Sequence, residues 1–126
     1  MSAGPVAERA ARLAAAVAWL SDADWSREVG RLAADAPASA PSSSPDPPTM
    51  GEVAREGVAL VEGLAAGGRW EEAAVQATHL ARYFAREGLR LGPITADAFD
   101  GLRAAALARD PDELADFVEL LREMFP

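Results

Sequence analysis

The sequence predicts an all-α fold of about six helices, paired as three stacked antiparallel hairpins, with a Pro/Ser-rich linker after the first hairpin. Three observations carry this prediction. Apolar residues recur at every third or fourth position through most of the chain. Alanine, the strongest helix former, supplies 30 of the 126 residues. Alternation with a period of two residues is absent and β-branched residues are scarce, so no strand is expected.

Residues 1–34 are expected to form an N-terminal helical hairpin. The apolar positions of its first helix are Val6, Ala10, Leu13, Val17 and Leu20. Ser21 and Asp22 interrupt this pattern, and Trp25, Val29 and Leu32 resume it as a short second helix. Because two such helices cannot hold a fold alone, we expect them to dock on another element.

Residues 35–48 are expected to be a semi-extended linker. They contain five prolines and four serines. Proline lacks an amide hydrogen and pushes the residue before it out of helical geometry. The linker therefore separates the first hairpin from a main four-helix domain at 49–126.

The first hairpin of the main domain has clear boundary signals. Thr49 and Glu52 have the spacing of a capping box, so a helix should follow Thr49. Gly67 and Gly68 should end that helix, because glycine enters left-handed geometry without penalty. The next helix should begin at Arg69 or Trp70 and stop at Gly88.

The last hairpin is bounded by a turn at Gly92-Pro93, with Thr95 expected as the cap of its first helix. Its second helix should start after Asp110. An N-cap aspartate, Pro111 at the first helical position and Glu113 two residues later form the sharpest boundary in the chain. This helix should continue to the end of the chain.

The segment Gly68-Arg-Trp-Glu-Glu-Ala73 resembles the turn and second helix of a tetratricopeptide (TPR) hairpin. The resemblance covers residues 53–86, where Leu60, Leu64 and Leu80 stand at apolar positions of such a unit. Val61 and Ala77 depart from the family pattern, and no proline closes the unit at Ala85. The resemblance implies helical hairpins and protein binding on a concave face.

Composition excludes several functions. The net charge of −8 disfavours binding to nucleic acid and to anionic membrane surfaces, because both are negatively charged. No apolar run is long enough to span a membrane, and a signal peptide is not expected because no basic leader precedes the first apolar segment. With no cysteine in the chain, thiol chemistry is excluded and a cytoplasmic location is expected.

His79 is the only histidine and the obvious catalytic candidate, because its charge can change near neutral pH. On a helical wheel it lies with Gln76, Tyr83 and Arg86, away from the apolar stripe, so we expect it to be exposed. No carboxylate orients it, and no second histidine or cysteine accompanies it. We therefore predict no catalytic residue, no metal site and no cofactor. Glu71 and Glu72 are interpreted as acids that stabilise a helix N-terminus.

Two charged stripes are candidate partner-binding surfaces. The first candidate surface consists of His79, Arg82, Tyr83 and Arg86, and its arginines recur every four residues through Arg90. On the last helix an acidic ridge opposes the apolar stripe, and it either docks a basic partner or is a solvated face. The ridge consists of Asp112, Asp116, Glu119 and Glu123.

Two aromatic residues lie off the main apolar stripes of their helices. The position of Tyr83 fits a binding anchor and a core-edge residue equally well, whereas Trp19 is expected to belong to the core. Glycines inside helices, at Gly57, Gly63 and Gly101, indicate close helix contact. That contact could lie within the chain or across a homo-oligomer.

These observations favour a non-enzymatic protein-interaction module or adaptor that acts through exposed helix faces. The alternative is a small acidic inhibitor, such as an immunity or antitoxin-like protein, that neutralises a basic toxin or nuclease. Both hypotheses require a protein partner.

Overall fold

The fold is described from a computed structural model, which places residues 4–20, 22–34, 48–87 and 93–125. Every secondary-structure element in these ranges is a helix, which confirms the all-α fold class. The helices are α1 (Gly4–Val17), α2 (Ala23–Ala33), α3 (Met50–Ala66), α4 (Trp70–Glu87), α5 (Pro93–Ala108) and α6 (Pro111–Met124). Most of the expected linker, the expected helix stop at Gly88, and Arg90 and Gly92 lie outside the described residues.

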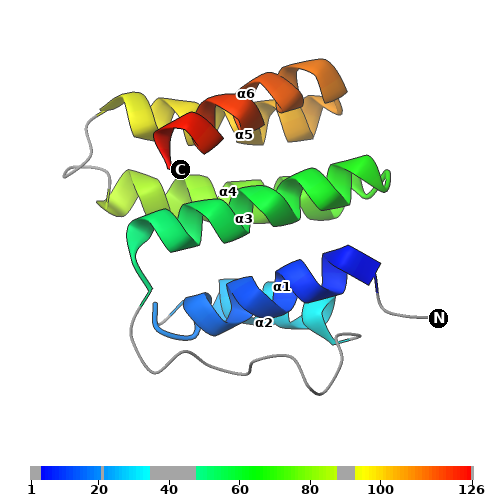
Figure 1. The fold of residues 1–126 in the computed structure, drawn as a ribbon, viewed down its shortest axis with the longest axis vertical. Helices are drawn as coiled ribbons and strands as arrows, with labels where there is room; N and C mark the ends of the chain where they lie inside the picture. Colours follow the sequence, from blue (N-terminus) through cyan, green and yellow to red (C-terminus); the bar gives the residue numbers. More distant parts are fainter. Residues whose placement is uncertain (1–3, 21, 35–47, 88–92, 126) are drawn as a thin grey trace.

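The six helices form three layers of antiparallel hairpins, α1–α2, α3–α4 and α5–α6, as the sequence predicts (Figure 1). Within this stack α6, α3 and α1 form one column, and α5, α4 and α2 form the column behind it (Figure 1). The third hairpin is reversed relative to the second, because α5 packs on its neighbour α4 and α6 returns to α3. Helices α3 to α6 therefore form a four-helix bundle in which each helix contacts two neighbours, and α3–α4 is the middle layer of the molecule.

The first hairpin docks on the middle layer. Helix α1 packs closely along α3, whereas α2 contacts α4 over a smaller region. Arg9 of α1 donates a hydrogen bond of 2.9 Å from Nη1 to the carbonyl of Ala59 in α3. Buried apolar residues of all six helices belong to one core. The prediction that the first hairpin docks on another element is therefore confirmed, and that element is the α3–α4 hairpin.

Side-chain caps fix three helix starts. Thr49 Oγ1 accepts a hydrogen bond from the Glu52 amide at 3.1 Å, and Asp110 Oδ1 accepts from the amides of Asp112 and Glu113, also at 3.1 Å. Asp22 caps α2 in the same way. The expectation that Thr95 caps α5 is wrong: α5 already begins at Pro93, and Thr95 lies buried inside its first turn. Proline has a backbone angle suited to the first helical position, so the helix starts there.

The α3–α4 and α5–α6 turns use the same backbone device. In each, a residue with positive φ follows the helix, and the next amide bonds back to a carbonyl five residues earlier (Arg69 to Leu64, Asp110 to Ala105). The residue with positive φ is Gly68 (77°) in the first turn and Arg109 (55°) in the second. Because both hairpins reverse direction in the same way, their helices lie antiparallel at close range.

Close packing inside the chain accounts for the glycines at Gly57, Gly63 and Gly101. A Cβ atom on Gly57 would collide with the Leu80 side chain of α4, and one on Gly101 would collide with the Phe117 ring of α6. Gly63 leaves room for the Arg9 guanidinium, whose Nη1 would lie 2.9 Å from an added Cβ. These glycines are therefore explained by contacts within one chain.

Candidate functional site

Helix α4 packs against α5 on one side and against α2 on another, and these contacts determine which of the predicted site residues are buried. Phe84 faces α5 and stacks on Phe99, with ring centroids 4.1 Å apart and planes 4° apart. On the other side Gln76, His79 and Tyr83 face α2. The expectation that His79 is exposed is wrong, because α2 covers it and leaves 9% of its surface accessible. Tyr83 is buried as well, at 7% exposure.

Trp25 of α2 is the residue that covers this side of α4. Its indole Nε1 donates a buried hydrogen bond of 2.9 Å to Oε1 of Gln76. Its ring lies parallel to the imidazole of His79, with centroids 5.9 Å apart, and tilted against Tyr83 at 6.0 Å. We call Trp25, Gln76, His79 and Tyr83 the polar aromatic cluster. It is a packed contact between helices, so the rings of Trp25, His79 and Tyr83 are not free to meet a partner.

Burial changes the titration of the cluster. It lowers the pKa of His79 below the ordinary 6.5; Asp22 at the start of α2 opposes this shift, and Arg82 adds to it. Nδ1 of His79 is buried and has no hydrogen-bond partner among the described residues. Burial also raises the pKa of Tyr83 above 10.0, with Glu87 adding to the effect. At neutral pH both side chains are therefore uncharged.

The sequence contains a signal for this contact that the apolar pattern does not reveal. Gln76, His79 and Tyr83 stand at positions i, i+3 and i+7, the spacing of one helix face. His79 and Tyr83 have rings that can pack on an indole, and Gln76 has an oxygen that can accept a hydrogen bond from the indole N–H. Read together with Trp25, the stripe is a second packing face of α4.

Arg82 and Arg86 remain exposed beside the cluster, as expected. Arg86 reaches across to α2, where its Nη2 lies 3.8 Å from Oδ2 of Asp22. Whether either arginine binds a partner stays a prediction. The four residues proposed for this face are thus divided into two buried rings and two surface cations.

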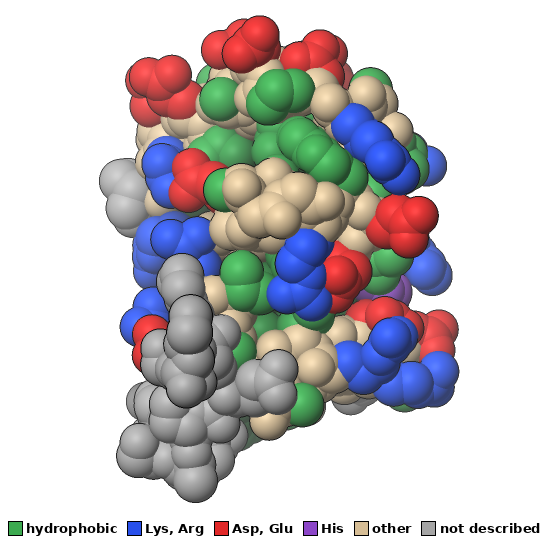
Figure 2. Space-filling model, turned by 90° about the vertical axis from the view of Figure 1, so that its right-hand side faces the viewer, with side chains coloured by type: hydrophobic (Ala, Val, Ile, Leu, Met, Phe, Trp, Pro, Cys, Tyr) green, Lys and Arg blue, Asp and Glu red, His purple; other side chains and the backbone are tan. Residues whose placement is uncertain are grey.

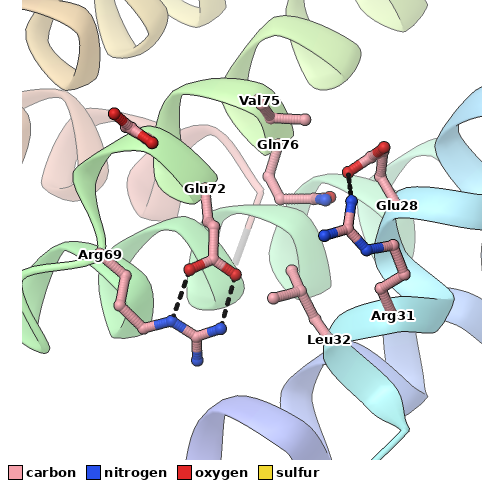
Figure 3. Close-up of a pocket in the computed structure, with 8 residues that line it drawn as sticks. Glu28, Arg31, Leu32, Arg69, Glu72, Val75 and Gln76 are labelled. Carbon is pink, nitrogen blue, oxygen red and sulfur yellow. Dashed lines mark hydrogen bonds and ion pairs between the residues drawn. The ribbon is translucent and has the colours of Figure 1, made fainter.

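A groove of about 340 Å³ opens between α2 and α4, next to the cluster (Figure 3). Its walls carry two ion pairs, Arg31 with Glu28 on α2 and Arg69 with Glu72 at the start of α4 (Figure 3). Leu32 and Val75 supply apolar surface, and the Gln76 side chain lies between the two pairs (Figure 3). We call this hollow the α2–α4 groove; sequence reasoning did not identify it, because its walls come from helices about 40 residues apart.

The acidic ridge lies on the outer face of α6. All four of its carboxylate residues are exposed, and none forms an ion pair with another described residue. Asp97 and Asp100 of α5 are exposed on the same layer. In Figure 2, acidic side chains gather along the upper end of the molecule, at the level of this layer. The ridge is thus an uncompensated negative surface.

Several large apolar residues are exposed. Leu107 of α5 is 58% exposed and Leu120, next to the ridge on α6, is 39% exposed. Trp19 is 47% exposed, so the expectation that it belongs to the core is wrong. Helix α1 ends at Val17, and Trp19 lies in the following turn, where helical periodicity no longer determines its direction.

Comparisons with known proteins give no match: no family model, no curated protein and no solved structure is significantly similar to this chain. The resemblance of residues 53–86 to a TPR hairpin stays a prediction. Among the described residues, no cluster of three or more histidine, aspartate or glutamate side chains is arranged to hold a metal ion. None of the described helices combines the length and apolar character needed to cross a membrane.

Proposed function

We propose that this chain is a non-enzymatic protein-interaction module that docks a basic partner on the outer face of the α5–α6 layer. The observation that carries the proposal is the acidic ridge, with four exposed carboxylates and no ion pair to a described residue. Elsewhere on the described surface, Asp24, Glu28 and Glu72 are paired with arginines, whereas Glu8, Glu52 and Glu87 form no ion pair with a described residue; the ridge differs in placing four such acids along one helix. Unpaired like charges on one helix destabilise it, so a partner that supplies positive charge offsets a standing cost.

Two further features support a docking face. The α5–α6 layer is one of the two outer layers of the stack, and no helix of the described residues lies above its outer side (Figure 1). Leu120 and Leu107 add apolar contact area beside the charges. A combination of apolar anchor and surrounding charge is typical of protein interfaces, in which charge governs the on-rate and buried side chains govern the lifetime.

The same face serves the alternative function, a small inhibitor that neutralises a basic toxin or nuclease. What favours this alternative is the net charge of −8 in a chain of 126 residues, with an excess of acids on the α5–α6 layer. A negative ridge competes with nucleic acid for a basic active site. The two functions differ in what docking does: an adaptor leaves the activity of its partner intact, and an inhibitor abolishes it.

The decisive experiment compares two variants with equal net charge. In one, the ridge is neutralised by Asp112→Asn, Asp116→Asn, Glu119→Gln and Glu123→Gln. In the control, four other exposed acids are neutralised by Glu8→Gln, Asp24→Asn, Glu52→Gln and Glu87→Gln. Wild type and both variants are immobilised, exposed to extract of the native organism and eluted with salt, and the bound proteins are identified by mass spectrometry.

We expect a basic protein that binds wild type and the control but not the ridge variant, with an association rate that falls steeply as salt increases. Assaying that partner with and without the chain then separates adaptor from inhibitor. Equal binding by the two variants would mean that the ridge is only a solvated face, and the proposal would be withdrawn.

A further inference from the structure

We infer that the α2–α4 groove is a second binding site, which takes an extended peptide segment. One apolar side chain of the peptide lies between Leu32 and Val75, and a backbone carbonyl accepts a hydrogen bond from Nε2 of Gln76. This site lies on the α2–α4 side of the middle layer and does not depend on the acidic ridge.

The orientation of the Gln76 amide is fixed by its neighbour. An indole N–H can only donate, so the Gln76 atom that lies 2.9 Å from Trp25 Nε1 is the oxygen. The amide nitrogen must then point away from Trp25, toward the α2–α4 groove (Figure 3). Gln76 is only 1% exposed, and no described residue accepts from its Nε2. The floor of the groove thus presents a fixed donor with no acceptor among the described residues.

The walls indicate which ligand carries that acceptor. Arg31 is paired with Glu28, and Arg69 forms two hydrogen bonds with Glu72. Glu71, the remaining charged residue of the lining, lies with its Oε1 3.9 Å from Nη2 of Arg109, so each charged residue of the lining has a partner of opposite sign. A free anion or cation meets an opposing charge beside each attractive one. Leu32 and Val75, the latter 39% exposed, supply apolar surface that suits a neutral, partly apolar ligand better than an ion. An uncharged peptide with an aliphatic side chain meets both demands.

The size of the groove selects an extended conformation. Its volume of about 340 Å³ lies near the lower end of the range for ligand clefts, roughly 300–1,000 Å³. An α-helix is about 10–12 Å across, so a hollow of this volume could take only one face of it. An extended chain also leaves its carbonyls free to accept hydrogen bonds, whereas a helix uses them internally.

Nuclear magnetic resonance with defined peptides tests the site directly. The ¹⁵N-labelled full chain is titrated with the tripeptide acetyl-Ala-Leu-Ala-amide and, as a control, acetyl-Ala-Ala-Ala-amide. We expect the leucine peptide to shift the Gln76 side-chain amide and the Trp25 indole N–H signals in a saturable way. The alanine peptide should bind about tenfold more weakly, because it lacks the apolar group.

Substitutions locate the binding. Gln76→Glu keeps an oxygen for Trp25 but replaces the donor nitrogen by a second oxygen, so affinity for the leucine peptide should fall at least about tenfold. Because Gln76 is buried, Val75→Asp serves as a second variant on the exposed wall and should weaken binding similarly. Its matched control is Leu107→Asp, an exposed apolar residue on α5, which should bind like wild type.

Two results would overturn the inference: no saturable shift of the Gln76 amide in wild type, or equal affinity for Val75→Asp and Leu107→Asp. The chain with the neutralised ridge should bind the tripeptide normally. Failure of one proposal can therefore be told apart from failure of the other.

Discussion

The two buried sides of α4 show two ways of holding a helix in place. Toward α5, Phe84 and Phe99 stack face to face, and the ring centroid of Phe125 lies 5.7 Å from that of Phe84. Toward α2, the contact depends on one indole hydrogen bond and on rings that carry polar atoms. The first contact gains stability from the apolar area it buries, whereas the second also requires that each buried polar atom find its partner.

This difference has a consequence for function. On the apolar side Phe84 and Phe99 are fully buried, while the polar side opens into the α2–α4 groove. A contact built from hydrogen-bonded groups can leave one donor for a ligand, as Gln76 does, and a stack of phenyl rings cannot. The polar side should also be the weaker and the more sensitive to pH.

The largest expected effect comes from breaking the apolar side. Phe99→Ala removes a fully buried ring and its stack on Phe84, so the free energy of unfolding should fall by about 3–5 kcal/mol. Ile94→Ala on the same helix is the control: Ile94 is 72% exposed, and the change should stay within about 0.5 kcal/mol. Urea denaturation followed by circular dichroism measures both. A loss below about 1 kcal/mol for Phe99→Ala would show that α5 is not held by this stack.

A smaller effect is expected on the polar side. Trp25→Phe keeps an aromatic ring but leaves Oε1 of Gln76 buried without a donor, which should cost about 1–3 kcal/mol. Combining it with Gln76→Leu removes both polar partners, so the double variant should be more stable than the sum of the single changes predicts. Denaturation of the four proteins in this cycle gives the coupling. Strict additivity would mean that the hydrogen bond contributes nothing.

The smallest effect is the pH response of the same side. His79 is buried with its pKa below 6.5, so the unfolded chain takes up a proton at a higher pH than the folded chain. Stability from His79 is therefore complete above pH 6.5 and is lost as pH falls from 6.5 through the lower folded-state pKa. Urea midpoints between about pH 5.5 and 7.5 should decrease with acidity in wild type.

His79→Gln is the control for that measurement, because glutamine has no proton to gain in this range. Its midpoint should change less between the same pH values than that of wild type. The interpretation fails if the two proteins show the same pH dependence, since the response would then come from carboxylates.

How much of this could be predicted from the sequence differs between the two sides of α4. The apolar stripe through Leu80 and Phe84, the cap at Thr49 and the Asp110-Pro111 boundary each depend on residues close together in the chain, and each is confirmed. The α2–α4 contact joins Trp25 to Gln76, 51 residues away, through polar groups that apolar periodicity does not register. Apolar periodicity therefore places His79 and Tyr83 on a surface open to a partner, whereas α2 covers that surface.

The candidate surfaces follow the same division. Exposure of the acidic ridge could be read from its helical spacing, because a face opposite an apolar stripe points outward. The α2–α4 groove could not, because its walls come from two helices that lie far apart in the sequence. Trp19 was misplaced for a local reason, since α1 ends two residues before it.

The reversed placement of the third hairpin also limits how this architecture can grow. In an open solenoid each new unit presents to its successor the same surface that its predecessor presented to it, so lengthening needs only duplication. Here α5 packs on α4 and α6 folds back onto α3, so the third hairpin stacks in the opposite order to the first two. A duplicated hairpin would therefore not repeat the previous contact, and simple duplication does not extend this architecture.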